Sequence, residues 1–263
     1  MQTRTVLITG ASKGLGEALA LQFAAPGVLL VLHGRDCGRL QSVSARCILQ
    51  GATVQQLVHD LRDHPGWMEK LAAQCVRTPI DLLVVNAGIA LTHLDGMEPW
   101  DDVSATLDVN LTAAIATATI GAAAMCARGK GQIALVSSLA AYVGMPQTPA
   151  YCASKAGLKA YGEALRARIA RHGVGVTVVL PGFVATDMSA RFPAATPFIV
   201  SSALAARHIA QALRRNPARI SFPQPLAFGM WVLSILPPAW SQRILRVTGY
   251  AELRRAKPRA RPD

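Results

Sequence analysis

The chain alternates short runs of apolar residues with longer segments in which apolar residues recur every three or four positions. A short apolar run flanked by turn residues is typical of a buried strand, whereas the longer spacing is typical of a helix that packs one face on a core. The pattern predicts about seven strands, six of which are clear: 5–9, 28–32, 53–60, 80–86, 131–138 and 174–181.

Predicted helices separate these strands. They cover residues 16–24, 38–50, about 100–127 and about 149–171. Strands that alternate with helices pair in parallel through right-handed crossovers, so the pattern predicts an α/β fold, a doubly wound parallel sheet with helices on both faces. No repeat or linker interrupts the pattern. We expect one domain over residues 1–240, ending in an apolar helix, and a basic tail over 241–263.

Composition indicates one large core and a reducing environment. Of the 263 residues, 51% are hydrophobic and 16% are charged, which suits a single globular domain. Five cysteines without a CxxC pair favour the cytoplasm over a disulfide framework. The longest apolar segment, Leu226–Trp240, is interrupted by Pro237 and Pro238 and is shorter than the ~20 residues of a membrane span. We therefore expect a cytoplasmic protein without a signal peptide or a membrane-spanning helix.

The net charge of +12 is concentrated near the C-terminus. Residues 241–263 contain seven cations and two acids, a net +5. Because no aromatic residues are interleaved with a basic stripe, binding to nucleic acid is not expected. The tail is either a solvated segment or a contact for a membrane surface or an acidic partner.

A glycine-rich loop follows the first strand. In "TGASKGLG", Gly10, Gly14 and Gly16 lie between a predicted strand and a predicted helix. Glycines at such a junction permit a tight turn and let the backbone approach a pyrophosphate at the helix N-terminus. This arrangement is typical of the dinucleotide-binding Rossmann form of the doubly wound sheet.

The stretch "YCASK" places Tyr151 four residues before Lys155. On a helix these two side chains share a face, and the ammonium group is expected to lower the pKa of the phenol from its reference near 10. Such a pair is a candidate proton donor and acceptor. Taken alone, these five residues fit an ordinary solvated Tyr/Lys pair better than a catalytic one.

The order of several motifs along the chain indicates a function for Tyr151 and Lys155. Six motifs follow one another along the chain: Thr9-Gly10 with the glycines that follow, "NAG" at 86–88, Asn110, "SS" at 137–138, "YCASK" and "PG" at 181–182. This is the order found in the short-chain dehydrogenase/reductase family, which the chain resembles over roughly residues 3–215. The resemblance implies that Tyr151 is the general acid/base and that Lys155 holds the nicotinamide ribose. Ser138 would hydrogen-bond the substrate oxygen, and Asn110 would order a water beside the lysine.

The resemblance also implies a nicotinamide cofactor and its contacts. In the family, an acid at the end of the second strand takes the adenosine ribose, whereas a cation there accommodates a 2′-phosphate. Gly34 falls at the acid's place and Arg35 follows it, with Lys13 as a second cation, so NADP (NADPH) is expected rather than NAD. Asp60, backed by Leu61, resembles the adenine-contacting aspartate, and Thr186 resembles the nicotinamide-amide contact. The implied cofactor-binding residues are Gly10, Ser12, Lys13, Gly14, Leu15, Gly16, Arg35, Asp60, Leu61, Asn86, Ala87, Gly88, Tyr151, Lys155, Pro181, Gly182, Val184 and Thr186.

The chemistry that follows is hydride transfer between the nicotinamide and a carbonyl carbon. Ser138 and Tyr151 would donate to the oxygen on which charge develops, and Tyr151 would deliver the proton. No metal is needed, and the six histidines show no metal-ligand spacing. The segment Phe183–Val200, expected as a loop over the site, is apolar. We therefore expect an NADP(H)-dependent enzyme that interconverts a ketone and a secondary alcohol on a small apolar substrate.

Two alternatives remain open. One is a 3-oxoacyl-[acyl-carrier-protein] reductase, for which Arg128, Lys130 and Arg171 would form a basic patch facing the carrier protein. The other is a nicotinamide-binding regulator without turnover. A regulator has no need of Ser138 and Tyr151 together with Lys155, which argues against it.

The expected partners are a second copy of the chain and a membrane surface. The resemblance implies a homodimer or homotetramer that pairs through the helices near 101–127 and 149–171, whose faces are rich in small residues. The apolar segment Phe222–Trp240 and the basic tail predict peripheral contact with a membrane, or else a lid over the substrate cleft or a subunit interface.

Overall fold

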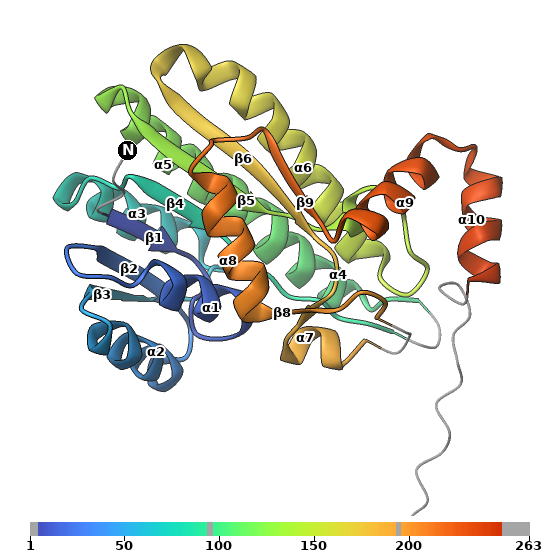
Figure 1. Cartoon of the computed structure of the whole chain (residues 1–263), viewed down its shortest axis with the longest axis horizontal. Helices are drawn as coiled ribbons and strands as arrows, with labels where there is room; N and C mark the ends of the chain where they lie inside the picture. Colours follow the sequence, from blue (N-terminus) through green and yellow to red (C-terminus); the bar gives the residue numbers. More distant parts are fainter. Residues whose placement is uncertain (1–4, 94–96, 193–195, 249–263) are drawn as a thin grey trace, which may run out of the picture.

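The protein is built on one parallel sheet. The computed structural model describes residues 5–93, 97–192 and 196–248, and its main sheet has the strand order β3-β2-β1-β4-β5-β6-β9, with every neighbouring pair parallel (Figure 1). The strands are β1 (Thr5–Ile8), β2 (Leu29–Gly34), β3 (Thr53–Val58), β4 (Leu82–Val85), β5 (Gly131–Val136), β6 (Val174–Pro181) and β9 (Arg219–Phe222). The predicted doubly wound fold is thus confirmed.

The central strands are buried on both faces. All four residues of β1 and of β4 and all eight of β6 are buried, as expected for parallel strands covered by helices on either side. From β1 the chain runs outward to β2 and β3 and then returns to β4 on the other side of β1. At such a reversal the carboxyl ends of the strands border a crevice in which ligands bind.

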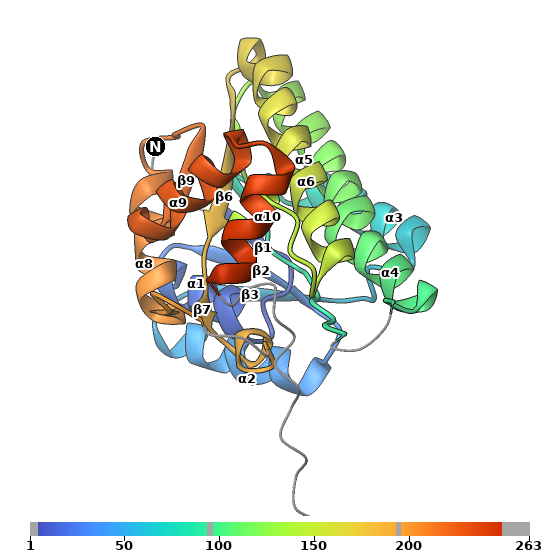
Figure 2. The same cartoon turned by 90° about the vertical axis from the view of Figure 1, so that its right-hand side faces the viewer.

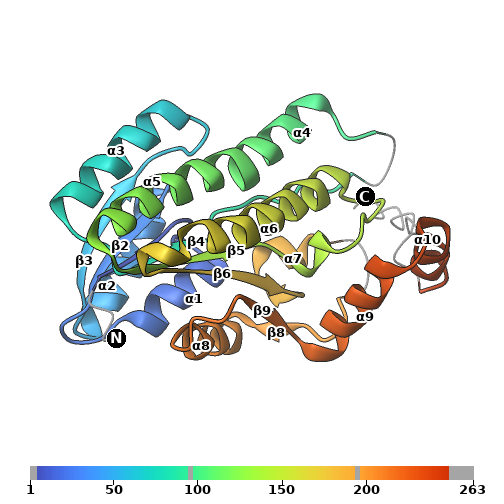
Figure 3. The ribbon, with the colours of Figure 1, turned by 90° about the horizontal axis from the view of Figure 1, so that it is seen from above.

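Helices form a layer on each face of the sheet (Figure 3). One layer, which shares a core with β1, β2 and β6, contains α1 (Gly14–Phe23), α2 (Cys37–Leu49) and α8 (Ser202–Leu213). The other contains α3 (His64–Arg77), α5 (Ala113–Arg128) and α6 (Pro149–Ile169), and its core includes the fully buried Trp67. In Figure 2, α5 and α6 run side by side across this second face.

The long apolar helix before β5 is continuous from Trp100 to Arg128. It consists of α4 (Trp100–Leu107), the π-helical turn η1 (Asp108–Thr112) and α5. Among the described residues, this helix is the one long and apolar enough to cross a membrane by length and composition, although half of its most apolar stretch is buried within the fold.

The segment expected as a loop over the site has some regular structure. Val184–Ala185 (β7) pairs in parallel with Val200–Ser201 (β8), and the short helix α7 (Asp187–Ala190) lies between them in sequence. This small second sheet lies near the carboxyl ends of the main strands (Figure 1).

The apolar C-terminal segment is two helices. After β9 the chain forms α9 (Gln224–Ile235) and then α10 (Pro238–Val247). Leu236 is extended and Pro237 precedes α10, because a residue before proline is kept out of the helical region. The predicted boundary between residues 240 and 241 therefore falls inside α10. The division into domain and tail stays a prediction, and residues 249–263 of the tail lie outside the described residues.

Candidate active site

The predicted site residues meet at the carboxyl ends of the central strands. The glycine loop follows β1, Asn86 follows β4, Ser138 lies two residues after β5, and β6 ends at Pro181. Tyr151 and Lys155 come from the first turns of α6, and Asn110 comes from η1. The family resemblance thus corresponds to one location on the fold, at the switch point of the sheet.

Backbone packing explains the glycines of the first loop. Gly10 has φ +67°, and a Cβ placed on it would lie 2.8 Å from the Cα of Ala87. A Cβ on Gly16 would lie 2.1 Å from the carbonyl oxygen of Gly10. Because the side chain of Lys13 makes no capping hydrogen bond at the start of α1, the first backbone N–H groups of that helix can receive a phosphate.

Thr9 and Asn86 join the loop to the next strand. The Thr9 hydroxyl accepts hydrogen bonds from the backbone N–H groups of Asn86 (2.9 Å) and Ala87 (3.1 Å). The Asn86 amide donates to the carbonyl oxygen of Thr9 at 3.0 Å. These contacts hold the glycine loop against "NAG", so that the two segments form one wall of the crevice.

His33 forms a hydrogen bond with the same loop, a contact that the sequence did not suggest. Its Nδ1 accepts from the N–H of Gly10 at 3.4 Å, and its Nε2 is 3.1 Å from the carbonyl oxygen of His59. These partners fix the neutral tautomer with the proton on Nε2. Burial lowers the pKa of His33 to about 4, so the ring stays neutral and ties β2 to the loop and to β3.

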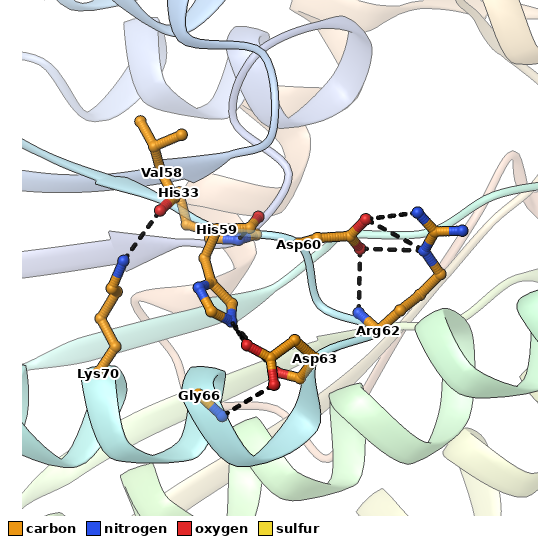
Figure 4. A network of polar contacts seen from close by, with 8 residues as sticks. All are labelled: His33, Val58, His59, Asp60, Arg62, Asp63, Gly66 and Lys70. Atoms are coloured by element: carbon orange, nitrogen blue, oxygen red, sulfur yellow. Dashed lines mark hydrogen bonds and ion pairs between the residues drawn. The ribbon is translucent and has the colours of Figure 1, made fainter.

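Charged side chains gather where β2 and β3 end (Figure 4). The Asp60 carboxylate accepts from Arg62, with Nη2 at 2.6 Å, and lies 3.8 Å from Nη1 of Arg35. The hydrogen bonds from Arg62 lower the pKa of Asp60 to about 2. Sequence reasoning missed Arg62, which competes with Arg35 for this carboxylate.

Asp36, the acid that follows Arg35, has another partner. Asp36 caps α2 by accepting from the backbone N–H of Arg39 at 3.0 Å, and so it is engaged away from the position of a ribose-binding acid. The acid's expected place, Gly34, packs against Ser12: a Cβ there would lie 3.3 Å from the serine hydroxyl oxygen. The Lys13 ammonium pairs with Asp187 at 3.8 Å. Lys13 thus links the glycine loop to α7.

Tyr151 and Lys155 share a face of α6, with the ammonium nitrogen 5.6 Å from the centre of the phenol ring. Only 4% of Lys155 is exposed, and its Nζ donates to the carbonyl oxygen of Val136 at 3.0 Å. Burial lowers the pKa of Lys155 to about 8. An ammonium group with that pKa can give up and regain a proton near neutral pH.

The expected lowering of the Tyr151 pKa is not found in this structure. Burial raises the pKa of the phenol to about 12, and a hydrogen bond with Ser138 offsets part of that rise. The reason is that moving a phenolate out of water costs more free energy than its interactions with nearby polar groups recover. Near neutral pH the phenol therefore holds its proton.

Asn110 is held rigidly beside the lysine. Its Oδ1 accepts from the N–H of Ile89 and its Nδ2 donates to the carbonyl oxygen of Ile89, both at 2.8 Å. A Cβ on Gly88 would lie 3.2 Å from Asn110 Oδ1 and 3.4 Å from Lys155 Nζ. Gly88 therefore lets both polar groups border the same space. Asn110 lies in a π-helical turn, a feature frequent at functional sites.

Ser138 and the segment after β6 complete the crevice. The Ser138 hydroxyl is 3.5 Å from the carbonyl oxygen of Pro181 and accepts from the N–H of Ala140 at 3.1 Å. The N–H of Gly182 donates to the carbonyl oxygen of Phe222 at 2.7 Å. Thr186 caps α7, and its Cγ2 would be 3.1 Å from a Cβ on Gly14. Thr186 thus lies against the glycine loop, whereas Val184 is buried in the core.

A cavity of about 610 Å³ is lined in part by the first turns of α6. Its walls are mostly apolar and come from residues 140–146, from α6 and from α10: Ala140, Ala141, Tyr142, Val143, Gly144, Met145, Pro146, Pro149, Cys152, Ala153, Ala156, Gln242, Leu245 and Arg246. Ser138, Tyr151 and Lys155 are not in its wall. Among the described residues, no cluster of three histidine, cysteine or acidic side chains could hold a metal.

The comparisons with known proteins agree with this geometry. Residues 4–196 match the short chain dehydrogenase family, and the chain belongs to the short-chain dehydrogenase/reductase family. It is an oxidoreductase that acts on CH–OH groups. An uncharacterized oxidoreductase of Myxococcus xanthus is 35% identical over 238 residues, which cover 90% of this chain and 94% of that protein.

Solved structures show the same fold. A putative NAD(P)-dependent gluconate 5-dehydrogenase from Beutenbergia cavernae with bound NADP has a TM-score of 0.75 at 25% identity, covering 87% of this chain and 96% of that one. A short-chain dehydrogenase from Sphingobium yanoikuyae in complex with NADPH has a TM-score of 0.78 at 24% identity, covering 98% of this chain and 100% of that one.

Proposed function

We propose that the protein is an NADP(H)-dependent reductase or dehydrogenase that interconverts a ketone and a secondary alcohol on an apolar substrate, with Tyr151 as the acid/base. The observation that carries this proposal is the convergence of Ser138, Tyr151, Lys155 and Asn110 beside a glycine loop at the switch point of the sheet. The close backbone approaches at Gly10 and Gly16 suit a bound pyrophosphate.

Each residue has a definite part in the proposed reaction. The reduced nicotinamide supplies the hydride when it is bound. Ser138 and Tyr151 donate hydrogen bonds to the substrate oxygen as it gains negative charge, and Tyr151 transfers its proton to that oxygen. Because the pKa of Tyr151 is about 12, the phenol is loaded with a proton at neutral pH, which favours carbonyl reduction. Lys155, with a pKa of about 8, can return a proton toward Tyr151, and Asn110 fixes the adjoining wall.

NADP preference is proposed to rest on Arg35, with the backbone at Gly34 and the hydroxyl of Ser12 beside it. Arg35 is exposed, and its contact with the Asp60 carboxylate is long at 3.8 Å. It is thus available for a 2′-phosphate, while Arg62 keeps Asp60 ionised. The other proposed contacts of the adenosine are with the backbone of Asp60 and Leu61.

Replacing Arg35 tests this preference. Arg35→Ala is expected to weaken NADPH binding by about 1.5–3 kcal/mol, the range for a hydrogen bond between charged groups, and to leave NADH binding nearly unchanged. Dissociation constants for both cofactors, measured by fluorescence, decide the point. Arg46→Ala removes the same charge from α2, where Arg46 pairs with Glu17, and serves as a control. Equal losses for NADPH and NADH in Arg35→Ala would show that Arg35 does not contact the 2′-phosphate.

The apolar cavity supports an apolar substrate. It adjoins the segment that follows Ser138 and the turn of α6 that carries Tyr151, so an aliphatic or aromatic group attached to the reacting carbon can extend into it. Turnover with NADPH should therefore be higher for ketones with long apolar groups than for polyhydroxy ketones. A screen of purified protein against both series and against acyl thioesters measures this. A preference for polyhydroxy ketones would contradict it.

The carrier-protein alternative is less well supported. Arg128 and Lys130 precede β5, and Arg171 precedes β6. These residues therefore lie at the amino ends of the strands, on the opposite edge of the sheet from Ser138 and Tyr151. Arg128 also donates to the carbonyl oxygen of Ile80. Within one chain, a patch in this place lies away from the position where a tethered thioester would react. A regulator without turnover is disfavoured because it requires no buried lysine beside a tyrosine.

The protein is proposed to form a homodimer through α5 and α6. The outward face of α6 carries exposed small residues, Ala160, Ala164 and Ala167, which permit close approach of a second helix pair. The faces of α5 and α6 lie side by side in Figure 2. Light scattering at micromolar concentration should show twice the chain mass of 27.8 kDa or a larger multiple. A species of single-chain mass alone would exclude the pairing.

A further inference from the structure

Helix α9 is apolar on both sides. Its inner face, which includes Ala227 and Met230, packs on residues that follow β5 and on β6. The opposite face carries Phe228, Trp231 and Ile235 at helical spacing, and all three are exposed, Phe228 to 66%. The rings of Phe228 and Trp231 lie 5.9 Å apart. Helices that are apolar all round are normally enclosed by protein or lipid.

Helix α10 continues the exposed apolar surface. Ser241 and Leu245 face the protein and are buried. Trp240, Ile244 and Val247 form the outward stripe and are exposed, Trp240 to 68%. In Figures 1 and 3 the two helices lie at one end of the molecule, beyond the edge of the main sheet. We call the two stripes, Phe228, Trp231, Ile235, Trp240, Ile244 and Val247, the apolar end face.

The segment that forms the apolar end face carries no acidic residue. Residues 188–251 contain no Asp or Glu, and Arg243 and Arg246 lie on α10 itself. Within the described residues, no ion pair involves either arginine. Five further cations follow in the sequence at 254, 255, 257, 259 and 261. Two such faces would repel one another, so a second copy of the chain is a poor partner for this surface.

We propose that the apolar end face docks on an anionic lipid surface. Exposed tryptophans and aliphatic side chains, with Arg243 on α10 beside them, match the chemistry of an interfacial helix. Each cation near an anionic surface adds roughly fivefold to binding at low salt. The inner side of α10 also lines the 610 Å³ cavity through Leu245 and Arg246, so docking would bring that cavity close to the lipid.

The test is sedimentation of the full-length protein with vesicles of phosphatidylcholine alone or mixed with phosphatidylglycerol. Binding is expected to the mixed vesicles at low salt, and to weaken at least tenfold at high salt or without the anionic lipid. The variant Phe228→Ser/Trp231→Ser/Trp240→Ser should weaken binding to mixed vesicles at least tenfold. Leu49→Ser/Val76→Ser is the matched control, because Leu49 is 87% exposed on α2 and Val76 is equally exposed on α3.

Each outcome decides the proposal. Unchanged thermal unfolding and cofactor affinity in the triple variant show that it is folded, so that a loss of vesicle binding can be assigned to the apolar end face. Arg243→Gln, which leaves the apolar stripe intact, provides a second variant and should lower binding about fivefold. Failure of the full-length protein to bind mixed vesicles at low salt overturns the proposal. So does vesicle binding that the triple variant retains. A dimer that the triple variant converts to monomers, without vesicle binding, would assign the face to a second copy instead.

Discussion

Replacing Tyr151 with phenylalanine is expected to lower turnover by about 10²-fold or more and to leave NADPH binding nearly unchanged. In the proposed reaction the phenol gives a proton to the substrate oxygen, and burial keeps it protonated, with a pKa of about 12. Phenylalanine fills the same space without a proton. Turnover and cofactor affinity are both measured, because the prediction is that only turnover changes.

Tyr161→Phe is the matched control for this experiment. Tyr161 lies on the same helix, and its hydroxyl is 2.9 Å from that of Thr119, away from the crevice. Its loss should leave turnover within about twofold of the original, as for most exposed substitutions. Near-normal turnover in Tyr151→Phe, on the best substrate found, would show that the proton comes from another group.

Replacing Lys155 with methionine is expected to abolish most activity and at the same time to stabilise the fold. Burial depresses the pKa of Lys155 from 10.5 to about 8, so below pH 8 the folded state carries a charge that it disfavours. Removing that charge is worth up to about 3 kcal/mol. The lost hydrogen bond to the carbonyl oxygen of Val136 offsets about 1 kcal/mol. A net gain of up to about 2 kcal/mol in the free energy of unfolding at pH 7 is expected.

The stability gained in Lys155→Met is expected to depend on pH. Between pH 8 and 10.5 the unfolded chain binds more protons at Lys155 than the folded chain does, so the stability of the original protein rises through this window. The advantage of Lys155→Met should therefore be largest below pH 8 and disappear near pH 10.5. Lys159→Met, on the same helix but paired with Glu163, should show no such gain. A variant less stable than the original at pH 7, with full turnover, would contradict the account.

The hydrophobic pattern predicted most of the fold because parallel strands buried on both faces are continuous apolar runs. The limits of β6 match the predicted strand at 174–181. The pattern did not identify α3, because its apolar residues are not confined to one face: Trp67 and Leu71 are buried, whereas Met68 and Val76 are exposed. It also merged α9 and α10, since the sequence on both sides of Pro237 is apolar.

Helix spacing predicted that Tyr151 and Lys155 meet, and the family resemblance named the other residues of the candidate site, but neither predicted how these residues interact. Tyr151 and Lys155 lie four residues apart on a helix, so their proximity follows from helix geometry. The pKa of Tyr151 does not, because it depends on how deeply the finished fold buries the phenol. The contacts of Arg62 and His33 depend on the register that pairs Gly34 with Val58, which no local pattern contains.

The central claim is that hydride passes from bound NADPH to a carbonyl carbon of an apolar ketone while Tyr151 supplies the proton. The most direct measurement uses NADPH carrying deuterium on C4 of the nicotinamide, with mass and NMR analysis of the alcohol formed. The account predicts one deuterium on the carbinol carbon for each cofactor oxidised, and about 10²-fold slower formation of the same labelled product by Tyr151→Phe. An alcohol without deuterium, or labelled product formed equally fast by Tyr151→Phe, would contradict it.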